Sequence, residues 1–353
     1  MTRRSLARSA VCALALAAAT PPLAGCTYSR AAGRAVSSLF ESPRKVTKEA
    51  NATDPEARLA MIWVGHATVL LQIDDKVILT DPVFTTTVGQ LSKRLVEPGF
   101  DVEKLPPIDA VAISHMHFDH LSLGSLAKIE SKTRMLLMPR GGATYLTDFG
   151  FPVLELGTWQ AWEKDGLRIT AVPVDHVGWR YGIDQEWMTE SFTGYVIEYH
   201  GLTVYFGGDT AYDQQSFVHT AQRFPGIDLA LIPIAPIEPH DFMRRVHMDP
   251  PEALQAFFDL GARRMVPIHY DTFVNSTDNP GDALRMLAEA QKKYVLNGRE
   301  VLPLEIGPRK VFLKKGETQK RFEPYPSAPP PPPPPPKPVP SQKTDIPDDD
   351  RLD

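Results

Sequence analysis

The stretch His115-Met116-His117-Phe118-Asp119-His120 decides the fold of this chain. It directly follows an apolar run at 110–114 that is typical of a buried strand. Three imidazoles and a carboxylate at a strand end can converge on a small volume. With only 10 histidines in 353 residues, this spacing rarely arises by chance. Neutral imidazole and carboxylate groups suit Zn²⁺, with Mn²⁺ or Fe as alternatives, so the motif predicts a metal site.

Three further residues occupy similar positions later in the chain. Each of His176, Asp209 and His269 follows a short strand-like run. Taken singly, they have simpler interpretations: a loop histidine, a turn residue after two glycines, and a core histidine. Their order and their positions at strand ends match those that a resemblance to a known family, the metallo-β-lactamase superfamily, implies for its remaining ligands.

The order of these residues resembles the metallo-β-lactamase superfamily, whose fold is an αββα sandwich with metals at one edge. The resemblance implies an α/β fold of this type and a site for two zinc ions. The seven implied ligands are His115, His117 and His176 for one ion, Asp119, His120 and His269 for the other, and Asp209 as the bridge.

Such a pair of cations would catalyse hydrolysis without a protein nucleophile. Cations about 3.5–4 Å apart lower the pKa of a shared water enough to make hydroxide at neutral pH, and they polarise a carbonyl or phosphoryl oxygen. Asp119 is also a candidate catalytic residue that would accept the proton of the water, with a pure ligand role as the equal alternative. Asp81 and His66 are candidates for the shell that orients the ligands. Their alternatives are a turn residue before proline and a core histidine.

Several segments narrow the resemblance to the N-acyl-phosphatidylethanolamine-hydrolysing phospholipase D branch. They are WVGHATVL at 63–70, ILTDPVF at 78–84, IDAVAISH at 108–115, LIPIAPIEP at 231–239, HMDPPEA at 247–253 and HYDTF at 269–273. That branch splits a phosphodiester to release an N-acylethanolamine and phosphatidic acid. The resemblance places His247 near the substrate, with a surface histidine before a helix as the alternative.

Two departures from the branch leave the substrate open. The stretch at 189–194 lacks an expected Trp-Gly-Ser step, and Tyr270-Asp271 replaces a Trp-Gly pair. Both positions are expected to line the substrate pocket, and a fold-level resemblance alone does not name a substrate.

The leading hypothesis is a dinuclear-zinc phosphodiesterase that acts on a phospholipid or a small phosphodiester. A metal-dependent lactonase is the first alternative, because lactonases use a similar ligand set. β-Lactam hydrolysis ranks third, since the segments typical of the phospholipase branch do not fit it. A hypothesis of another class is a non-catalytic metal-binding envelope lipoprotein, whose signature would be a lost ligand; none of the seven is missing.

Both ends of the chain are expected to lie outside the catalytic domain. Basic residues followed by an apolar run at 11–19 indicate a secretory signal that is too short to span a bilayer. Leu23-Ala24-Gly25-Cys26 resembles the lipobox of bacterial lipoproteins, which implies a signal peptide at 1–25 and a lipid on Cys26. A plain signal peptide is the alternative. The lipid would hold the protein in the bacterial cell envelope, facing the periplasm, at the outer membrane.

The expected domain organisation follows from these ends. Residues 26–57 are expected as a tether, 58–315 as the catalytic domain, and 316–353 as a disordered proline-rich and acidic tail that includes eight consecutive prolines at 329–336. The tail is interpreted as a spacer, with a docking ligand as the alternative.

Charge and cysteine count exclude other classes of protein. The net charge is −5, so no basic footprint indicates nucleic acid as a partner. Cys12 lies in the expected signal and Cys26 would carry lipid, which leaves the domain without a thiol nucleophile, a disulfide or cysteine-ligated zinc. The expected partners are the substrate and the membrane, and no pattern indicates an oligomeric state.

Short β-rich runs alternate with turn signals along 58–315. Strands are expected at 61–64, 68–73 and 77–79, which form a meander, and at 110–114, 136–137, 167–172, 193–199, 203–206, 229–232 and 265–267. Helices are expected at 125–129, 250–260 and 282–292. Asp249 and Glu252 predict a capping box at the start of the second helix.

Overall fold

The computed structural model describes residues 33, 36–89, 92–185 and 187–318. The expected signal peptide, Cys26 and the proline-rich run lie outside the described residues. Among the described residues, no helix combines the length and the apolarity needed to cross a bilayer.

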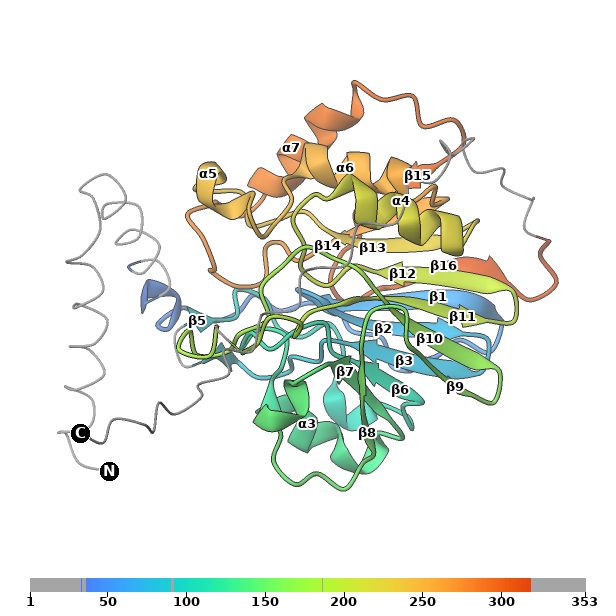
Figure 1. Cartoon of the computed structure of the whole chain (residues 1–353), viewed down its shortest axis with the longest axis horizontal. Helices are drawn as coiled ribbons and strands as arrows, with labels where there is room; N and C mark the ends of the chain where they lie inside the picture. Colours follow the sequence, from blue (N-terminus) through green and yellow to red (C-terminus); the bar gives the residue numbers. More distant parts are fainter. Residues whose placement is uncertain (1–32, 34–35, 90–91, 186, 319–353) are drawn as a thin grey trace, which may run out of the picture.

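The domain is built on two seven-stranded sheets (Figure 1). The first contains, in spatial order, β16 (Arg309–Lys314), β1 (Ala57–Gly65), β2 (Thr68–Ile73), β3 (Lys76–Thr80), β6 (Ala110–Ala112), β7 (Leu136–Pro139) and β8 (Val153–Leu156). The second contains β15 (Glu300–Val301), β14 (Arg264–Ile268), β13 (Leu229–Pro233), β12 (Leu202–Phe206), β11 (Gly194–Tyr199), β10 (Leu167–Val172) and β9 (Ala161–Lys164). A small ribbon pairs β4 (Thr87–Val88) with β5 (Ser92–Lys93).

Helices cover the outer face of each sheet (Figure 1). The second sheet carries α4 (Gln214–Arg223), α6 (Pro250–Asp259) and α7 (Asp282–Gln291), and the first sheet carries α3 (Leu123–Ile129). A short helix, α5 (His240–Met243), lies at one end of the sandwich, at the left of Figure 1. This arrangement is the αββα sandwich expected from the sequence.

Two apolar clusters hold these layers together, and β1 contributes to both. Met61 and Trp63 belong to the cluster between the sheets, which continues under α6 and α7. Ile62 and Val64 belong to the cluster under α3. Successive strand residues point to opposite faces, and in β1 both faces are covered. Its sequence is therefore apolar throughout instead of alternating.

The strand directions bring one set of strand ends to a common edge. In the first sheet β3 and β6 run parallel, so the residues after Thr80 and after Ala112 leave the sheet on the same side. In the second sheet β10 and β11, and β11 and β12, are antiparallel, whereas β12, β13 and β14 are parallel. The ends of β10, β12 and β14 therefore share one edge, and the predicted ligands follow these ends.

The central strands and the three helices expected from sequence are present within a few residues of their expected bounds. The meander is confirmed, because β1, β2 and β3 are antiparallel neighbours. The capping box is also confirmed: Asp249 accepts from the Glu252 backbone, and the Glu252 side chain accepts from the Asp249 backbone.

The sequence analysis missed α4, α5 and several edge strands, including β8, β9 and β16. In α4 the buried side of the helix is formed by Ser216, Phe217 and Thr220. Because two of these three residues are polar, the helix shows no apolar period. β8 and β9 are four-residue strands at sheet edges, and two residues of each are exposed, so neither shows the longer buried run of a central strand.

The second half of the expected tether packs on the domain. The Arg44 backbone N–H donates to Leu95 O at 2.9 Å, and Lys48 Nζ lies 2.8 Å from Asp101 Oδ1. Further along, Asp54 N donates to Gln72 Oε1 at 2.8 Å. Residues 44–56 therefore form part of the folded unit, although their polar sequence contains no sustained apolar period.

Candidate metal centre

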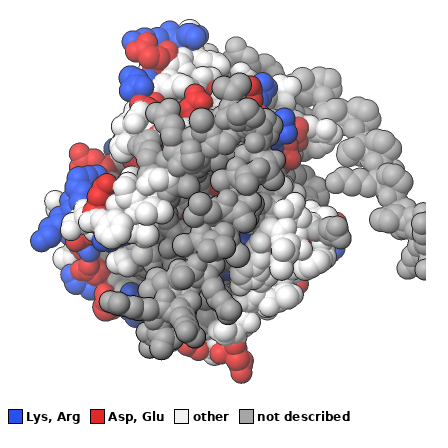
Figure 2. All heavy atoms as spheres, turned by 90° about the vertical axis from the view of Figure 1, so that its left-hand side faces the viewer, with Lys and Arg blue, Asp and Glu red and all other residues white. Residues whose placement is uncertain are grey.

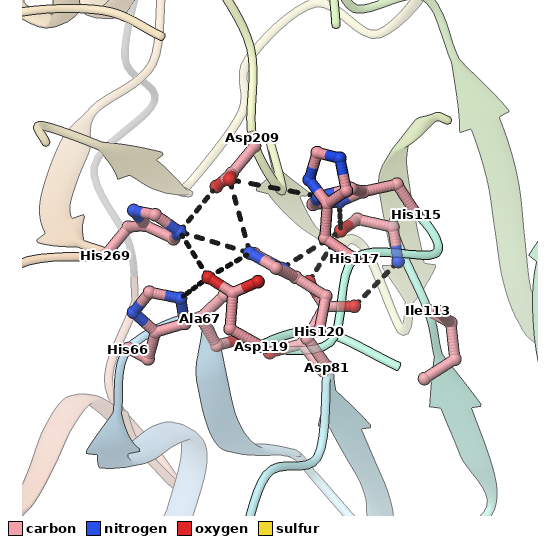
Figure 3. Close-up of polar contacts among 12 residues, drawn as sticks. His66, Ala67, Asp81, Ile113, His115, His117, Asp119, His120, Asp209 and His269 are labelled. Atoms are coloured by element: carbon pink, nitrogen blue, oxygen red, sulfur yellow. Dashed lines mark hydrogen bonds and ion pairs between the residues drawn. The ribbon is translucent and has the colours of Figure 1, made fainter. Parts of the chain in front are cut away.

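The fold brings all seven predicted ligands into one largely buried group. Figure 3 labels six of them: His115, His117, Asp119, His120, Asp209 and His269. Their donor atoms form three overlapping sets, and within each set the atoms lie within 4.8 Å of one another. The sets are His115, His117 and His176; His115, His120 and Asp209; and His66, Asp119, His120 and His269.

The first set presents three imidazole nitrogens to a common space. His115 Nε2 lies 2.8 Å from His117 Nδ1, and the buried His176 Nε2 has no hydrogen-bond partner. The opposite nitrogens of His176 and His115 are occupied, whereas the buried His117 Nε2 has no hydrogen-bond partner. His176 Nδ1 donates to Val246 O at 2.7 Å, and His115 Nδ1 donates to Ser114 Oγ at 2.9 Å. These bonds fix the tautomers that leave the inner lone pairs free.

The second set is arranged in the same way. His120 Nε2 and His269 Nε2 face each other at 3.1 Å. His120 Nδ1 donates to Asp81 Oδ2 at 2.6 Å, and His269 Nδ1 donates to Ala235 O at 2.8 Å. Asp119 Oδ2 lies 3.8 Å from His120 Nε2 and 3.9 Å from His269 Nε2.

Asp209 lies between the two sets, as expected for a bridge. Its Oδ2 is 3.2 Å from His120 Nε2, 3.9 Å from His115 Nε2 and 4.0 Å from His176 Nε2. Its Oδ1 is 3.0 Å from His269 Nε2. A single buried carboxylate therefore reaches donors of both sets.

The electrostatics of the group suit divalent cations. Burial lowers the pKa of His115 and of His176 well below the usual value, so both rings are neutral, as a ligand must be. Burial raises the pKa of Asp209, but attraction to His120 and His269 outweighs it and holds that pKa well below its usual range. Imidazole nitrogens facing one another at 2.8–3.1 Å beside ionised carboxylates form a donor set that fits bound metal.

Asp81 and Ser114 form hydrogen bonds to the ring nitrogens of His120 and His115 that face away from the other donors. The fully buried Asp81 carboxylate accepts from Ser114 N at 2.7 Å, from Ser114 Oγ at 2.6 Å and from His120 Nδ1. Ser114 Oγ in turn contacts His115 Nδ1. The sequence analysis singled out Asp81 but missed Ser114, although its place between the strand and His115 was a usable signal.

His66 was expected in the shell of residues that orients the metal ligands. The structure places it among the donors of the second set. Its Nε2 is 2.9 Å from Asp119 Oδ2, and its ring centroid is 3.8 Å from that of His269. Burial, followed by repulsion from His269, lowers the pKa of His66 to about 3. The neutral ring therefore donates to the Asp119 carboxylate and orients it.

His247 lies beside Asp209. Its Nδ1 is 3.7 Å from Asp209 Oδ2, and its ring centroid is 5.2 Å from that of His176. The residue follows α5, directly after Val246, whose carbonyl holds His176. Burial lowers the pKa of His247 to about 4, so the ring is neutral at pH 7.

The two departures from the branch pattern have structural roles in this chain. Tyr270 is buried, with its ring centroid 4.8 Å from that of Trp63, and Asp271 accepts from Gly281 N. Ser191 Oγ donates to Arg140 O at 2.8 Å, and Thr193 Oγ1 donates to Val172 O at 3.1 Å. Through these hydrogen bonds and this ring contact, the side chains link the loops that surround the donors.

Comparison with known proteins agrees with this geometry. Residues 76–270 match the model of the beta-lactamase superfamily domain. An uncharacterized protein of Mycobacterium tuberculosis is 33% identical over 253 residues, which cover 68% of this chain and 66% of that protein. The N-acyl-phosphatidylethanolamine-hydrolyzing phospholipase D 1 of Caenorhabditis elegans is 30% identical over 259 residues, 67% of this chain and 72% of the relative.

A solved structure shows the same fold. The isothiocyanate hydrolase from Delia radicum gut bacteria superposes with a TM-score of 0.58 at 19% sequence identity. The match covers 72% of this chain and 99% of the other.

Proposed function

Because the chain belongs to the metallo-β-lactamase superfamily and is a metal-dependent hydrolase with a binuclear His/Asp site, we propose that it cleaves a phosphodiester bond in a phospholipid or a related amphiphile. We further propose zinc as the resident metal, because nitrogen and carboxylate donors at this spacing suit it. The similarity to a phospholipase D of Caenorhabditis elegans supports the choice of bond.

The observation that carries the proposal is a group of exposed apolar side chains next to the donors. The connection between β10 and β11 exposes Tyr181, Ile183 and Trp187, whose exposed fractions are 59%, 82% and 64%. The Tyr181 ring lies 5.7 Å from that of Phe118, inside the metal motif. Exposed apolar groups beside a polar reaction centre suit a substrate with an acyl chain and a charged headgroup.

The surface around this end of the molecule is consistent with such a substrate. Figure 2 shows the face at the left of Figure 1, where α5 and β5 lie. On the described surface to the left and right of the centre of that view, uncharged atoms predominate, and Lys, Arg, Asp and Glu side chains lie mostly toward the rim.

The residues of the site have separate tasks in this proposal. When bound, the cations would supply Lewis acidity and acidify a water molecule. Asp119 would accept the proton released during attack, since it is ionised and 21% of its side chain is exposed. His66 holds that carboxylate in place. The neutral His247 ring would donate a hydrogen bond to a substrate oxygen near Asp209.

The test is direct. Zinc-loaded protein is incubated with N-acylated and with ordinary phospholipids, and the release of phosphatidic acid is measured. Phosphatidic acid from either lipid supports the proposal, and N-acylethanolamine from the first identifies the preferred headgroup. Turnover of a lactone with no phosphatidic acid would replace it with the lactonase alternative.

Replacing the exposed apolar side chains by polar ones should lower the rate of cleavage only for a substrate that is part of a lipid bilayer. Changing Ile183 and Trp187 together to Ser is expected to slow cleavage of bilayer lipid by at least about tenfold, because one apolar side chain contributes about 1.5–3 kcal/mol when fully desolvated and about 1.36 kcal/mol corresponds to a tenfold change in rate. Cleavage of a short-chain, water-soluble analogue should stay the same. Rates on both substrates measure the effect.

A matched control is Val295→Ser. Val295 is 77% exposed and precedes β15, at the edge opposite the donors, because β15 runs parallel to β14. This variant should cleave both substrates at the rate of the unmodified protein. Equal losses on both substrates in the double variant would contradict a role in lipid contact.

We also propose the lipid anchor on Cys26, which rests on the sequence at 23–26. Cys26→Ser is expected to move most of the protein from the membrane fraction to the soluble periplasmic fraction and to abolish incorporation of labelled palmitate. Cys12→Ser, within the same leader, is the control and should change neither. Membrane association of Cys26→Ser equal to that of the unmodified chain would contradict the anchor.

A further inference from the structure

The connection between β10 and β11 also carries a buried arginine that the proposed reaction does not use. Only 6% of Arg180 is exposed. Its Nη1 donates to Met116 O at 2.7 Å and to Leu121 O at 2.9 Å. One guanidinium nitrogen thus bonds two carbonyls that lie five residues apart in the metal motif.

These carbonyls bracket the segment that carries His117, Asp119 and His120. Within the segment the backbone forms a single turn: His120 N donates to His117 O at 3.1 Å, and Leu121 N donates to the same oxygen at 2.9 Å. One turn on its own is marginal in water, because forming it fixes several dihedral angles in exchange for few hydrogen bonds. The guanidinium group bonds the carbonyl of the residue before the turn, Met116, and the carbonyl of its last residue, Leu121.

A third contact comes from the middle of the segment. The guanidinium carbon lies 4.2 Å from the centre of the Phe118 ring, which is a cation–π distance. A planar guanidinium can stack on a ring and donate in its own plane at the same time, whereas an ammonium group cannot. Phe118 lies between His117 and Asp119 in the sequence, so this contact restrains how the turn rotates.

Arg180 is itself held from the first sheet. Asp184 Oδ2 accepts from Arg180 N at 2.8 Å, and Asp184 Oδ1 accepts from Tyr181 N at 3.0 Å. The hydroxyl of Tyr145 donates to Asp184. Tyr145 ends a short helical turn (Gly142–Tyr145) that follows β7. Through Asp184, the segment that carries Arg180 therefore connects the metal motif to the helical turn that follows β7.

The burial of this guanidinium is costly. The buried Arg180 Nε has no hydrogen-bond partner, and a buried cation with incomplete hydrogen bonding costs several kcal/mol. Packing alone is served better by an apolar side chain of the same volume. The cost is offset where the charge and the planar geometry have a specific task.

We propose that Arg180 is a positioning residue that sets the spacing of His117, Asp119 and His120, and thereby the affinity of the centre for divalent cations. Arg180 is not among the grouped donor residues, and it acts on them through the backbone carbonyls and the ring that it contacts. The inference rests on the metal dependence of the protein and not on the phosphodiester substrate.

The test is a titration of metal-free full-length protein with Co²⁺, followed by visible absorption of the bound ion. Arg180→Met is expected to weaken binding by about 10–100-fold, the usual effect of losing a group that orients metal ligands, and to change the absorption spectrum. Arg180→Lys should weaken binding less, because it retains a donor but not the stacked plane. Tyr145→Phe should act in the same direction with a smaller effect.

Arg58→Lys is the matched control. Arg58 also bonds a carboxylate and a carbonyl, those of Asp74 and His200, near the turn between β2 and β3 at the opposite edge of the sheet. It should change neither the Co²⁺ affinity nor the spectrum. Arg180→Lys and Tyr145→Phe keep the test decisive should Arg180→Met fail to fold.

Folded Arg180 variants that bind Co²⁺ with unchanged affinity and spectrum would overturn the proposal and leave Arg180 a role in stability alone. Co²⁺ binding by the unmodified protein is independent of the substrate. Failure of this inference is therefore distinguishable from failure of the phosphodiesterase proposal.

Discussion

Asp209→Asn is expected to abolish most of the hydrolytic activity, lowering kcat/KM by about 10³-fold or more. Asp209 reaches donors of both sets, so loss of its charge removes a shared ligand. Metal ions contribute several kcal/mol to the stabilisation of charge in the transition state. Each 1.36 kcal/mol corresponds to about a tenfold change in rate. The substitution conserves volume, so the expected loss is chemical and not a consequence of repacking.

The measurement combines kinetics with metal analysis. Asp209→Asn protein should bind less than two equivalents of zinc under conditions that load the unmodified chain. The control is Asp213→Asn, since Asp213 caps α4 and asparagine caps a helix equally well. That variant should retain both the rate and the metal content. Full metal content and full rate in Asp209→Asn would show that the carboxylate does not bridge.

Removal of the metal should lower the melting temperature of the domain by about 10–20 °C. A ligand present at about 100 times its Kd stabilises the folded state by about 2.7 kcal/mol, and the centre is proposed to hold two cations. For a domain of this size each kcal/mol corresponds to about 2–4 °C. Chelation also leaves the ionised Asp119 and the buried, ionised Asp209 without their proposed counterions.

Thermal unfolding with and without a chelator measures this effect, and re-addition of zinc should restore the original value. Asp209→Asn provides an internal control, because its melting temperature should respond much less to the chelator. If the chelator left the melting temperature of the unmodified protein unchanged, the cations would have to bind folded and unfolded chains equally, contrary to a preformed centre.

The positions of the central strands were predictable because a short apolar run between turn residues is visible in the sequence itself and is typical of a buried strand. β2 and β10 match their expected bounds, since both are short apolar runs between turn residues. α6 was predicted at its first residue because the capping box is a signal within four residues. α4 was not predicted, since the buried side of that helix includes Ser216 and Thr220.

The metal motif was recognisable because its residues are close together in the sequence and occur at a strand end. Other parts of the site have no local signature. Arg180 contacts Met116 across 64 residues, and His176 is held by a carbonyl 70 residues away. His66 approaches Asp119 across 53 residues. Such contacts depend on how loops fold over the edge of the sandwich, which no period or motif encodes.

By itself, the sequence of this protein determined the class of fold, the metal chemistry and the identity of most donors. The metal chemistry follows from side chains spaced a few residues apart at a strand end, whereas the class of fold and the assignment of the donors followed from the resemblance to the metallo-β-lactamase superfamily. Three features were decided by the tertiary structure alone. His66 lies among the donors, and Ser114 hydrogen-bonds both Asp81 and His115. Arg180 donates to the carbonyls of Met116 and Leu121 on either side of the ligands. The physical reason is that parallel strand ends bring a set of loops together, but packing of the whole sandwich selects which side chains of those loops meet.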